Sequence, residues 1–357
     1  LLRWAVTGRD DLGINTQCWR IFEAMRADAT ANDADWAELC YLWSSDFRTH
    51  ITEARWTEYR ARLAACARRW PADPAPAVSI RDSVRLPASA GAKIQVVRNG
   101  RFLDIEGERF QLRLNCLRGL ALHSLVDRTV SEVSLCGTLP HGYYDDIQWA
   151  ADYYSGHLVF ESPGRAKVTD LNPVEPSLAW DGDTLLISGQ IQTPLGLVEK
   201  QWRVDEAQGR IGLNYRLHWP EVDLGSLRLG YLTLNPQAFA AHTLGYQTHN
   251  GGRDLESFRL AQGDFDHGAS VSFLISAKQA LGLTGGQLRM GDARCGIGVQ
   301  MDKSECAAVG LVMHRKIKNS YLCRFAFTLK ELDDTSRGSS QGGFGFAFSL
   351  APGVRSC

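Results

Sequence analysis

Apolar residues recur at steps of three and four up to about residue 70, and this spacing predicts amphipathic helices. Asn15 or Thr16 is the expected cap of a first helix, a second follows Asp33 or Asp35, and Thr52 is the expected cap of a third. The apolar stripe of the first helix is Cys18, Ile21, Phe22 and Met25. That of the second is Trp36, Leu39, Cys40, Trp43 and Phe47, and that of the third is Trp56, Tyr59, Leu63, Cys66 and Trp70. Such stripes must be buried against one another or against a neighbour, so residues 1–70 are predicted to form a three-helix bundle.

A different pattern follows a segment rich in Pro and Ala, residues 71–91, which has no periodicity and is predicted to be a linker. In VVRNGRFLDIEG, Asn99-Gly100 favours a type I′ turn between two short strands. Short alternating runs separated by Gly, Asn and Asp continue to the end of the chain, apart from residues 145–157, where a short helix or an ordered loop is expected. The pattern predicts a large antiparallel β-sandwich over residues 92–357 and therefore an α+β, multidomain chain.

Composition excludes several classes of protein. The net charge of -1, without a Lys/Arg cluster, argues against nucleic acid and acidic membranes as partners. No apolar run approaches the roughly 18 residues of a membrane span. The nine scattered cysteines contain no CxxC pair, which favours a reducing cytoplasm over a disulfide framework or a zinc site. The chain also lacks GxSxG, P-loop, Rossmann and HExxH motifs, and we expect no metal and no cofactor.

A carboxylate stands out in the stretch LCYLWSSDFRTHI, residues 39–51, which we expect to be helical. Helical spacing would place Asp46 on adjoining parts of one surface with Trp43 and His50. Because a buried carboxylate without partners costs several kcal/mol, roughly, Asp46 needs partners. These are either local, as an ion pair with Arg48 or His50 or a cap for the Thr52 helix, or the hydroxyls of a sugar in a cleft whose floor is Trp43.

Adjacent acidic pairs occur elsewhere, and one of them lies among aromatic residues. Neighbouring side chains diverge, so such pairs rarely form the facing carboxylates of glycosidic cleavage, and turn or cap roles are the simpler explanation. In HGYYDDIQWAADYYSGH, however, Asp145 and Asp146 lie close in sequence to Tyr144 and Trp149. We treat Asp145, Asp146 and Trp149 as candidate ligand contacts because flat rings stack on sugars.

A polar loop is predicted in HTLGYQTHNGGRDLESF, residues 242–258, where His249, Asn250 and Arg253 surround two glycines. Glycines allow a sharp turn that brings different donors together, so these residues are candidate ligand contacts. A simple hairpin turn is an equally good explanation of the same sequence. The spacing of His242, His249 and His267 matches no compact metal motif.

Three stretches together suggest a family. WSSDFRTHI resembles the SSDW-type segment of the helical region that follows the catalytic barrel in glycoside hydrolase family 57. NCLRGLALHSLV and THNGGRDLESF resemble segments of the galactose-mutarotase-like β-sandwich that trails the barrel in that family and in the related family 38 α-mannosidases. The resemblance covers essentially the whole chain, but it is to the non-catalytic half of those enzymes only. We therefore expect that an upstream part precedes Leu1.

The resemblance implies a retaining enzyme acting on α-glucans or related α-glycosides. Its nucleophilic Glu and its acid/base Asp would lie on an upstream barrel, so the catalytic residues of this chain stay unknown. Trp43 and Asp46 match the segment that helps to close the substrate cleft, while Phe47 stands where the motif commonly has Trp. Arg48, Thr49 and His50 also depart from the usual aromatic or apolar run, which leaves the substrate open.

We therefore expect the C-terminal part of a glycoside hydrolase or transglycosidase, with an oligosaccharide or polysaccharide substrate and the upstream barrel of the same chain as its partners. The alternatives are a carbohydrate-binding sandwich, which would use residues such as Tyr144, Trp149, His249 and Arg253, or a purely structural sandwich. A self-contained mutarotase-like epimerase is a further alternative, with His249 as acid and Glu256 as base.

Overall fold

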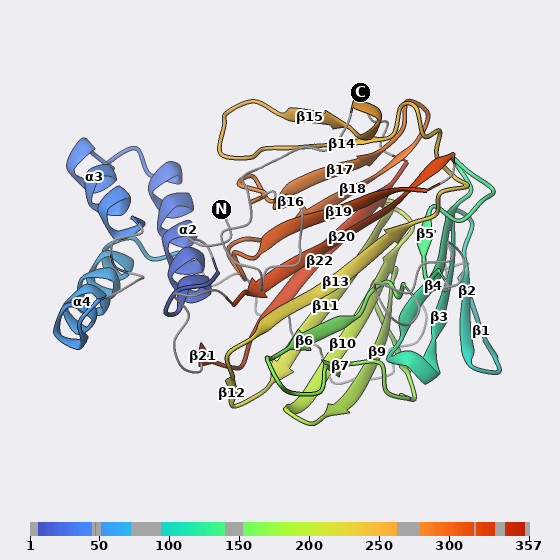
Figure 1. Cartoon of the computed structure of the whole chain (residues 1–357), viewed down its shortest axis with the longest axis horizontal. Helices are drawn as coiled ribbons and strands as arrows, with labels where there is room; N and C mark the ends of the chain where they lie inside the picture. The colour runs from blue at the N-terminus through green and yellow to red at the C-terminus, as the bar shows by residue number, and fades with distance from the viewer. Residues whose placement is uncertain are drawn as a thin grey trace.

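A computed structural model describes residues 6–44, 47, 51–72, 94–139, 153–262, 279–280, 282–317, 319–332 and 340–353. Within these residues, three helices gather at one end of two large antiparallel sheets that pack face to face (Figure 1). The predicted α+β class, with helices first and a large antiparallel sandwich after them, is confirmed. The predicted linker lies almost entirely outside the described residues.

The first described helix, α2 (Asp11–Ala27), starts earlier than the sequence suggested. Its N-cap is Asp10, so the prediction of a cap at Asn15 or Thr16 is wrong. Both of these residues lie inside the helix and make tertiary contacts instead. Asn15 Oδ1 accepts a hydrogen bond from Trp43 Nε1 at 2.9 Å, and Thr16 Oγ1 accepts one from the Ala307 N–H at 3.0 Å.

The second helix, α3 (Asp33–Leu42), is capped by Asn32 in a reciprocal capping box with Asp35. It ends at Leu42, so the predicted helix over residues 39–51 is confirmed for residues 39–42 and wrong at Trp43 and Ser44, while residues 45, 46 and 48–50 lie outside the described residues. Cys40, which was assigned to the apolar stripe, is exposed. The buried stripe passes instead through Leu39 and Leu42, which lie on the face turned toward the other two helices.

The third helix, α4 (Glu53–Arg69), agrees with its pattern. Thr52 caps it by accepting a hydrogen bond from the Arg55 N–H. All five positions of the predicted stripe are buried: Trp56, Tyr59, Leu63, Cys66 and Trp70. The three helices enclose an apolar cluster of their own, to which Cys18, Ile21 and Met25 of α2 also belong.

The larger sheet has 11 strands, ordered β1-β2-β3-β4-β5-β13-β20-β19-β16, with β6 also paired to β13 and β7 to β6. Its strands are β1 (Gln95–Asn99), β2 (Phe102–Glu106), β3 (Phe110–Asn115), β4 (Ala121–Asp127), β5 (Cys136–Gly137), β6 (Leu158–Glu161), β7 (Val168–Thr169), β13 (Ser226–Leu234), β16 (Gln279–Ala280), β19 (Val309–Ile317) and β20 (Ser320–Lys330). The first hairpin is displaced by one residue from its predicted position. Asn99 pairs with Phe102, so the turn consists of Gly100 and Arg101, and Gly100 supplies the positive φ of 57°.

The second sheet has nine strands, ordered β15-β14-β17-β18-β22-β11-β10-β9-β8, and a two-stranded ribbon joins β12 to β21. The strands are β8 (Ser177–Asp181), β9 (Thr184–Thr193), β10 (Gly196–Asp205), β11 (Arg210–His218), β12 (Glu221–Val222), β14 (Gly245–Thr248), β15 (Glu256–Arg259), β17 (Gln287–Gly291), β18 (Gly296–Met301), β21 (Ser340–Gln341) and β22 (Gly345–Pro352). One 3₁₀ turn, Cys116–Arg118, follows β3, and another, Leu260–Gln262, follows β15.

A fully buried ion pair lies among the apolar side chains of the core between the sheets. Lys200 Nζ lies 2.5 Å from Asp170 Oδ2, and neither side chain is accessible to solvent. Lys200 Nζ also donates to the carbonyl oxygens of Gly119 and Gly156, each at 2.7 Å. Burial lowers the pKa of Lys200 and raises the pKa of Asp170, because each charge has left water. This lysine therefore joins three separate segments of the chain at the centre of the sandwich.

The helices are attached to the sandwich through α2. Arg20 Nε donates to the Ser304 carbonyl oxygen at 2.5 Å, one turn beyond the bond between Thr16 and Ala307. Leu12, at the start of α2, belongs to the core of the sandwich rather than to that of the helices. These contacts fix one face of α2 beside the loop that follows β18.

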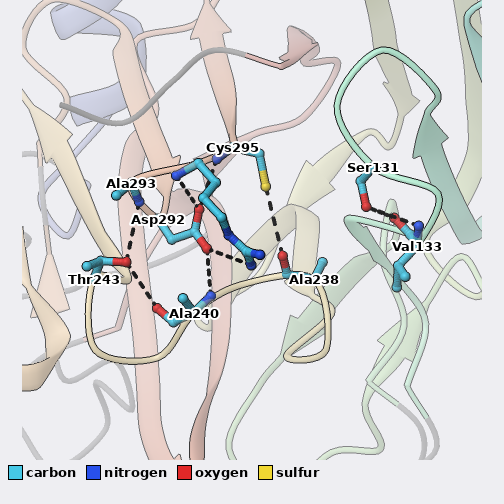
Figure 2. Close-up of polar contacts among 9 residues, drawn as sticks. Ser131, Val133, Ala238, Ala240, Thr243, Asp292, Ala293 and Cys295 are labelled. Carbon is cyan, nitrogen blue, oxygen red and sulfur yellow. Dashed lines mark hydrogen bonds and ion pairs between the residues drawn. The ribbon is translucent and has the colours of Figure 1, made fainter.

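At the opposite end of β17 and β18, a buried carboxylate organises the turn between the two strands (Figure 2). Asp292 accepts backbone hydrogen bonds from Ala240 at 2.6 Å, Arg294 at 2.8 Å and Cys295 at 2.9 Å. Burial by itself would raise the pKa of Asp292, but these N–H donors hold it below its usual value. The carboxylate thereby fastens the turn to the loop after β13.

We expect Asp292→Ala to lower the free energy of unfolding by about 2 to 4 kcal/mol, because three backbone N–H donors lose a buried, charged acceptor. Because the folded-state pKa is depressed, the stabilisation is present above the ordinary pKa of 3.8 and is lost as the pH falls through the lower folded-state value. Urea unfolding at neutral and at acidic pH measures both effects. A difference between wild type and variant that stayed constant down to strongly acidic pH would contradict this role.

Candidate functional site

A cleft of about 1040 Å³ lies between the helices and the outer face of the nine-stranded sheet. One wall comes from α2 and the end of α4, and the other comes from β9, β10, β11, β18 and β22. The residues that define it best are Trp19, Arg20, Glu23, Asp28, Arg69, Trp70, Arg203, Asp205, Arg210, Asn214, Gln300, Asp302, Lys303, Ser304 and Ser349. Its volume lies at the upper end of the range of about 300 to 1,000 Å³ that is usual for ligand sites.

The helical wall carries two tryptophans. Trp19 lies on α2, where its ring packs against Phe22 with the centroids 5.4 Å apart. The ammonium group of Lys303 lies 5.5 Å from the centre of the Trp19 ring, across the cleft from α2. Trp70 ends α4, and the guanidinium of Arg69 lies 5.5 Å from the centre of its ring. Both indoles are partly held by their own helices, which limits their movement.

The opposite wall is polar because of strand alternation. Along β10 and β11 the side chains of Trp202, Val204 and Leu213 point into the core, so those of Arg203 and Asn214 point outward into the cleft. Asn214 is only 7% exposed, yet its amide makes no hydrogen bond with any described residue. Its amide oxygen and nitrogen are not enclosed by protein, so they offer an acceptor and donors to a ligand in the cleft.

Two titratable groups at the edge of the cleft have shifted pKa values. Burial lowers the pKa of Lys303 to about 8. Burial and, to a smaller extent, the charge of Asp302 raise the pKa of Glu305 to about 7. Lys303 and Glu305 are both half-buried in the loop after β18, whose Ser304 bonds to Arg20 of α2, and this burial is the cause of both shifts.

The sequence-predicted contacts are distributed over other parts of the chain. Trp43 is half-buried between helices, and its indole N–H donates to Asn15, so it lines neither this cleft nor the second hollow described below. Asp46, Arg48 and His50 lie outside the described residues, as do Tyr144, Asp145, Asp146 and Trp149. Their assignment as sugar contacts stays a prediction.

The predicted loop after β14 is described in full, and the structure places its polar residues at the edge of the nine-stranded sheet. The carbonyl oxygen of His249 accepts hydrogen bonds from the N–H and the hydroxyl of Thr284, both at 3.0 Å. Arg253 and Glu256 are exposed, while Asn250 is half-buried. The roles proposed for His249, Asn250, Arg253 and Glu256 stay predictions. Within the described ranges, no three His, Cys, Asp or Glu side chains come together as a metal site would require.

Sequence reasoning missed Asn214 and the other residues of the cleft. RIGLNYRLHW correctly predicts a strand, but alternation alone does not show whether its polar face meets bulk water or a helix. The available signal was the pair Asn214 and Arg216, polar residues at alternate positions of a strand whose other face is continuously apolar.

The chain was compared with protein-family models, curated proteins and solved structures. No family model matches the chain, and no curated protein matches it. A galactose mutarotase-like protein from Clostridium acetobutylicum is similar at 9% identity, with a TM-score of 0.42 over 74% of this chain and 98% of that one. A 4-α-glucanotransferase from Thermococcus litoralis is similar at 9% identity, with a TM-score of 0.35 over 96% of this chain and 50% of that one. A GH36 α-galactosidase from Geobacillus stearothermophilus is similar at 10% identity, with a TM-score of 0.36 over 74% of this chain and 41% of that one.

None of the described helices has the length and apolar character that crossing a membrane requires.

Proposed function

We propose that the chain binds an oligosaccharide in the cleft between α2, α4 and the nine-stranded sheet. The observation that carries this proposal is Asn214, a residue only 7% exposed that lines the cleft and whose amide, still open to the cleft, bonds to no side chain or backbone group of the described residues. Hydroxyl groups both donate and accept hydrogen bonds, and a side-chain amide offers both functions in one plane. An amide in this setting therefore suits a sugar hydroxyl better than it suits an ion.

The composition of the walls supports a saccharide rather than an apolar ligand. Trp19, which is half-buried, supplies flat apolar surface, and Trp70 adds a smaller part because it is only 8% exposed. Carboxylates and guanidinium groups stand on both walls, and amides stand on the sheet. Charges of both signs are present, with Glu23 and Asp28 on the helix and Arg203 and Arg210 on the sheet. A neutral ligand rich in hydroxyls can pair with all of these groups without leaving one charge uncompensated.

A finer assignment rests on the three sequence segments that resemble glycoside hydrolase family 57. In that proposal the chain is the C-terminal part of a retaining hydrolase or transglycosidase, and an upstream barrel carries the catalytic carboxylates. The described chain would then bind saccharide without cleaving it. This assignment depends on the motifs, whereas the binding proposal depends on the cleft.

Isothermal titration calorimetry with maltooligosaccharides and mannosides tests the binding proposal. We expect saturable binding by the wild-type chain. We expect Asn214→Ala to raise the Kd roughly 5- to 30-fold, since about 1 to 2 kcal/mol of amide hydrogen bonding to the ligand is lost.

Gln190→Ala is the matched control, because Gln190 is an exposed amide on β9 of the same sheet that does not line the cleft. Its affinity should equal that of the wild type. Arg210→Ala gives a second test at the rim of the cleft and does not disturb a buried residue. If a folded chain bound none of these saccharides, or bound them with equal affinity in all three variants, the cleft would not be the saccharide site.

A further inference from the structure

A second, smaller hollow of about 370 Å³ lies on the outer face of the 11-stranded sheet, around the loops next to β2, β3 and β4. It is lined by Arg101, Asn115, Leu117, Arg118, His123, Thr138, Tyr154 and Pro173. None of these residues lines the cleft described above. We call it the arginine pocket.

The charge of the arginine pocket is one-sided. Neither Arg101 nor Arg118 has a carboxylate within 4.0 Å among the described residues, and no Asp or Glu lines the pocket. The nearby Arg113 is different, because its guanidinium is held by both oxygens of Asp104 at 2.5 and 3.1 Å. The guanidinium groups of Arg101 and Arg118 are both exposed and have no counter-ion in the described chain, so they are free to bind an anion in the pocket.

The pocket also presents neutral donors. Asn115 is 9% exposed, and its Oδ1 accepts a hydrogen bond from the Leu117 N–H at 3.1 Å. That bond orients the amide so that its NH₂ group is the part left for a ligand. The ring of His123 is fixed against Phe102, with the centroids 4.7 Å apart. Burial, with the charges of Arg113 and Arg101, lowers the pKa of His123, which agrees with a positive potential here.

The lining is held in place by buried groups behind it. Arg118 Nε donates to the Tyr154 hydroxyl at 3.2 Å, and the Tyr154 carbonyl oxygen accepts from Arg324 Nη2 at 3.1 Å. Arg324 is buried and lies over the ring of Tyr231, 4.6 Å from its centre. The ring of His157 stacks on this same Tyr231 ring, with the centroids 4.7 Å apart. The pocket therefore has a rigid back wall, which reduces the entropy lost when a ligand binds.

We propose that the arginine pocket binds the oxyanion of a small molecule of monosaccharide size, a phosphate or a carboxylate, through Arg101, Arg118 and Asn115. The site is separate from the saccharide cleft and does not depend on it. Guanidinium groups match the geometry of both oxyanions, so the protein chemistry is the same for either. The size of the pocket excludes a long anionic polymer as an enclosed ligand.

Titration calorimetry of the whole chain with inorganic phosphate, glucose 6-phosphate, glucuronate and glucose tests the proposal. We expect binding of the anions and none of glucose at this site. A preference for glucose 6-phosphate identifies a phosphate site, and a preference for glucuronate identifies a carboxylate site. Arg101→Gln/Arg118→Gln should weaken binding of the preferred anion at least about tenfold, since each charge-assisted hydrogen bond is worth more than a neutral one.

Arg165→Gln is the matched control, because Arg165 is an exposed arginine of the same sandwich that pairs with Asp223 and lies outside the pocket. It should bind the anion as the wild type does, and so should Asn214→Ala, which alters only the cleft. Equal weakening in Arg165→Gln and in the double variant would reduce the effect to general surface charge and overturn the proposal. Absence of binding by all three anions to the folded wild type would overturn it as well.

Discussion

Replacing Lys200 by Met is expected to lower the free energy of unfolding by about 3 to 5 kcal/mol, which is typical when one partner of a buried ion pair is removed. Asp170 would remain fully buried without its cation, and the carbonyl oxygens of Gly119 and Gly156 would lose their donor. The Asp170 carboxylate can then be neutralised only by taking up a proton. Chemical denaturation followed by tryptophan fluorescence measures the loss.

The pH dependence of the Lys200→Met variant provides a second measurement. Without the lysine, the folded-state pKa of Asp170 rises further above its unfolded value, so stability is retained at low pH and lost as the pH rises. The deficit of the variant should therefore be smaller at mildly acidic than at alkaline pH. Lys167→Met is the control, since its partner Glu161 is about half exposed and a surface pair contributes about 1 kcal/mol or less. Equal losses in the two variants would contradict the buried-pair account.

Arg228→Met is expected to be similarly damaging, at about 3 to 5 kcal/mol, and for a related reason. Arg228 contacts both oxygens of Glu331, at 2.5 and 2.8 Å, and both side chains are buried. Ser226 and Thr328 also donate to this carboxylate, at 2.7 and 2.8 Å. Burial alone would lower the pKa of Arg228, but the charge of Glu331 and the hydrogen bonds to it raise the pKa.

The matched control for this variant is Arg128→Met. Arg128 pairs with Glu106 at 3.0 Å on the same sheet, but both side chains are more than 40% exposed. Thermal and urea unfolding should show a small effect in the control and a large one in Arg228→Met. A wild-type unfolding midpoint in Arg228→Met would mean that Ser226 and Thr328 are sufficient to hold Glu331.

The helices and strands were largely predictable, because each pattern depends on near neighbours in the sequence. The α4 stripe and its Thr52 cap, and the strands that alternate around Trp202 and Leu213, follow from local periodicity. The errors arose where a tertiary contact replaced a local one. Thr is a common N-cap residue, which is why Thr16 was predicted to be one. In the structure α2 begins at Asp11, and the Thr16 hydroxyl accepts a hydrogen bond from the Ala307 N–H instead.

The two hollows could not be predicted from the sequence, because their lining comes together only when distant elements pack. Trp19 and Asn214 are nearly 200 positions apart and share the cleft. The segment NCLRG, by contrast, contained a usable signal. Gly119 has a φ of 57°, and a Cβ there would lie 1.8 Å from the Asp170 carbonyl oxygen, so a glycine is required beside the buried ion pair.

The attachment of α2 affects the order in which the protein can assemble during synthesis. Arg20 and Thr16 bond to residues 284 and 291 positions later in the chain. At about 5 to 20 residues per second, a ribosome needs roughly 15 to 60 s to make that intervening length. The face of α2 that meets the sandwich, including Leu12, therefore stays uncovered for that interval and is a surface on which a chaperone can act.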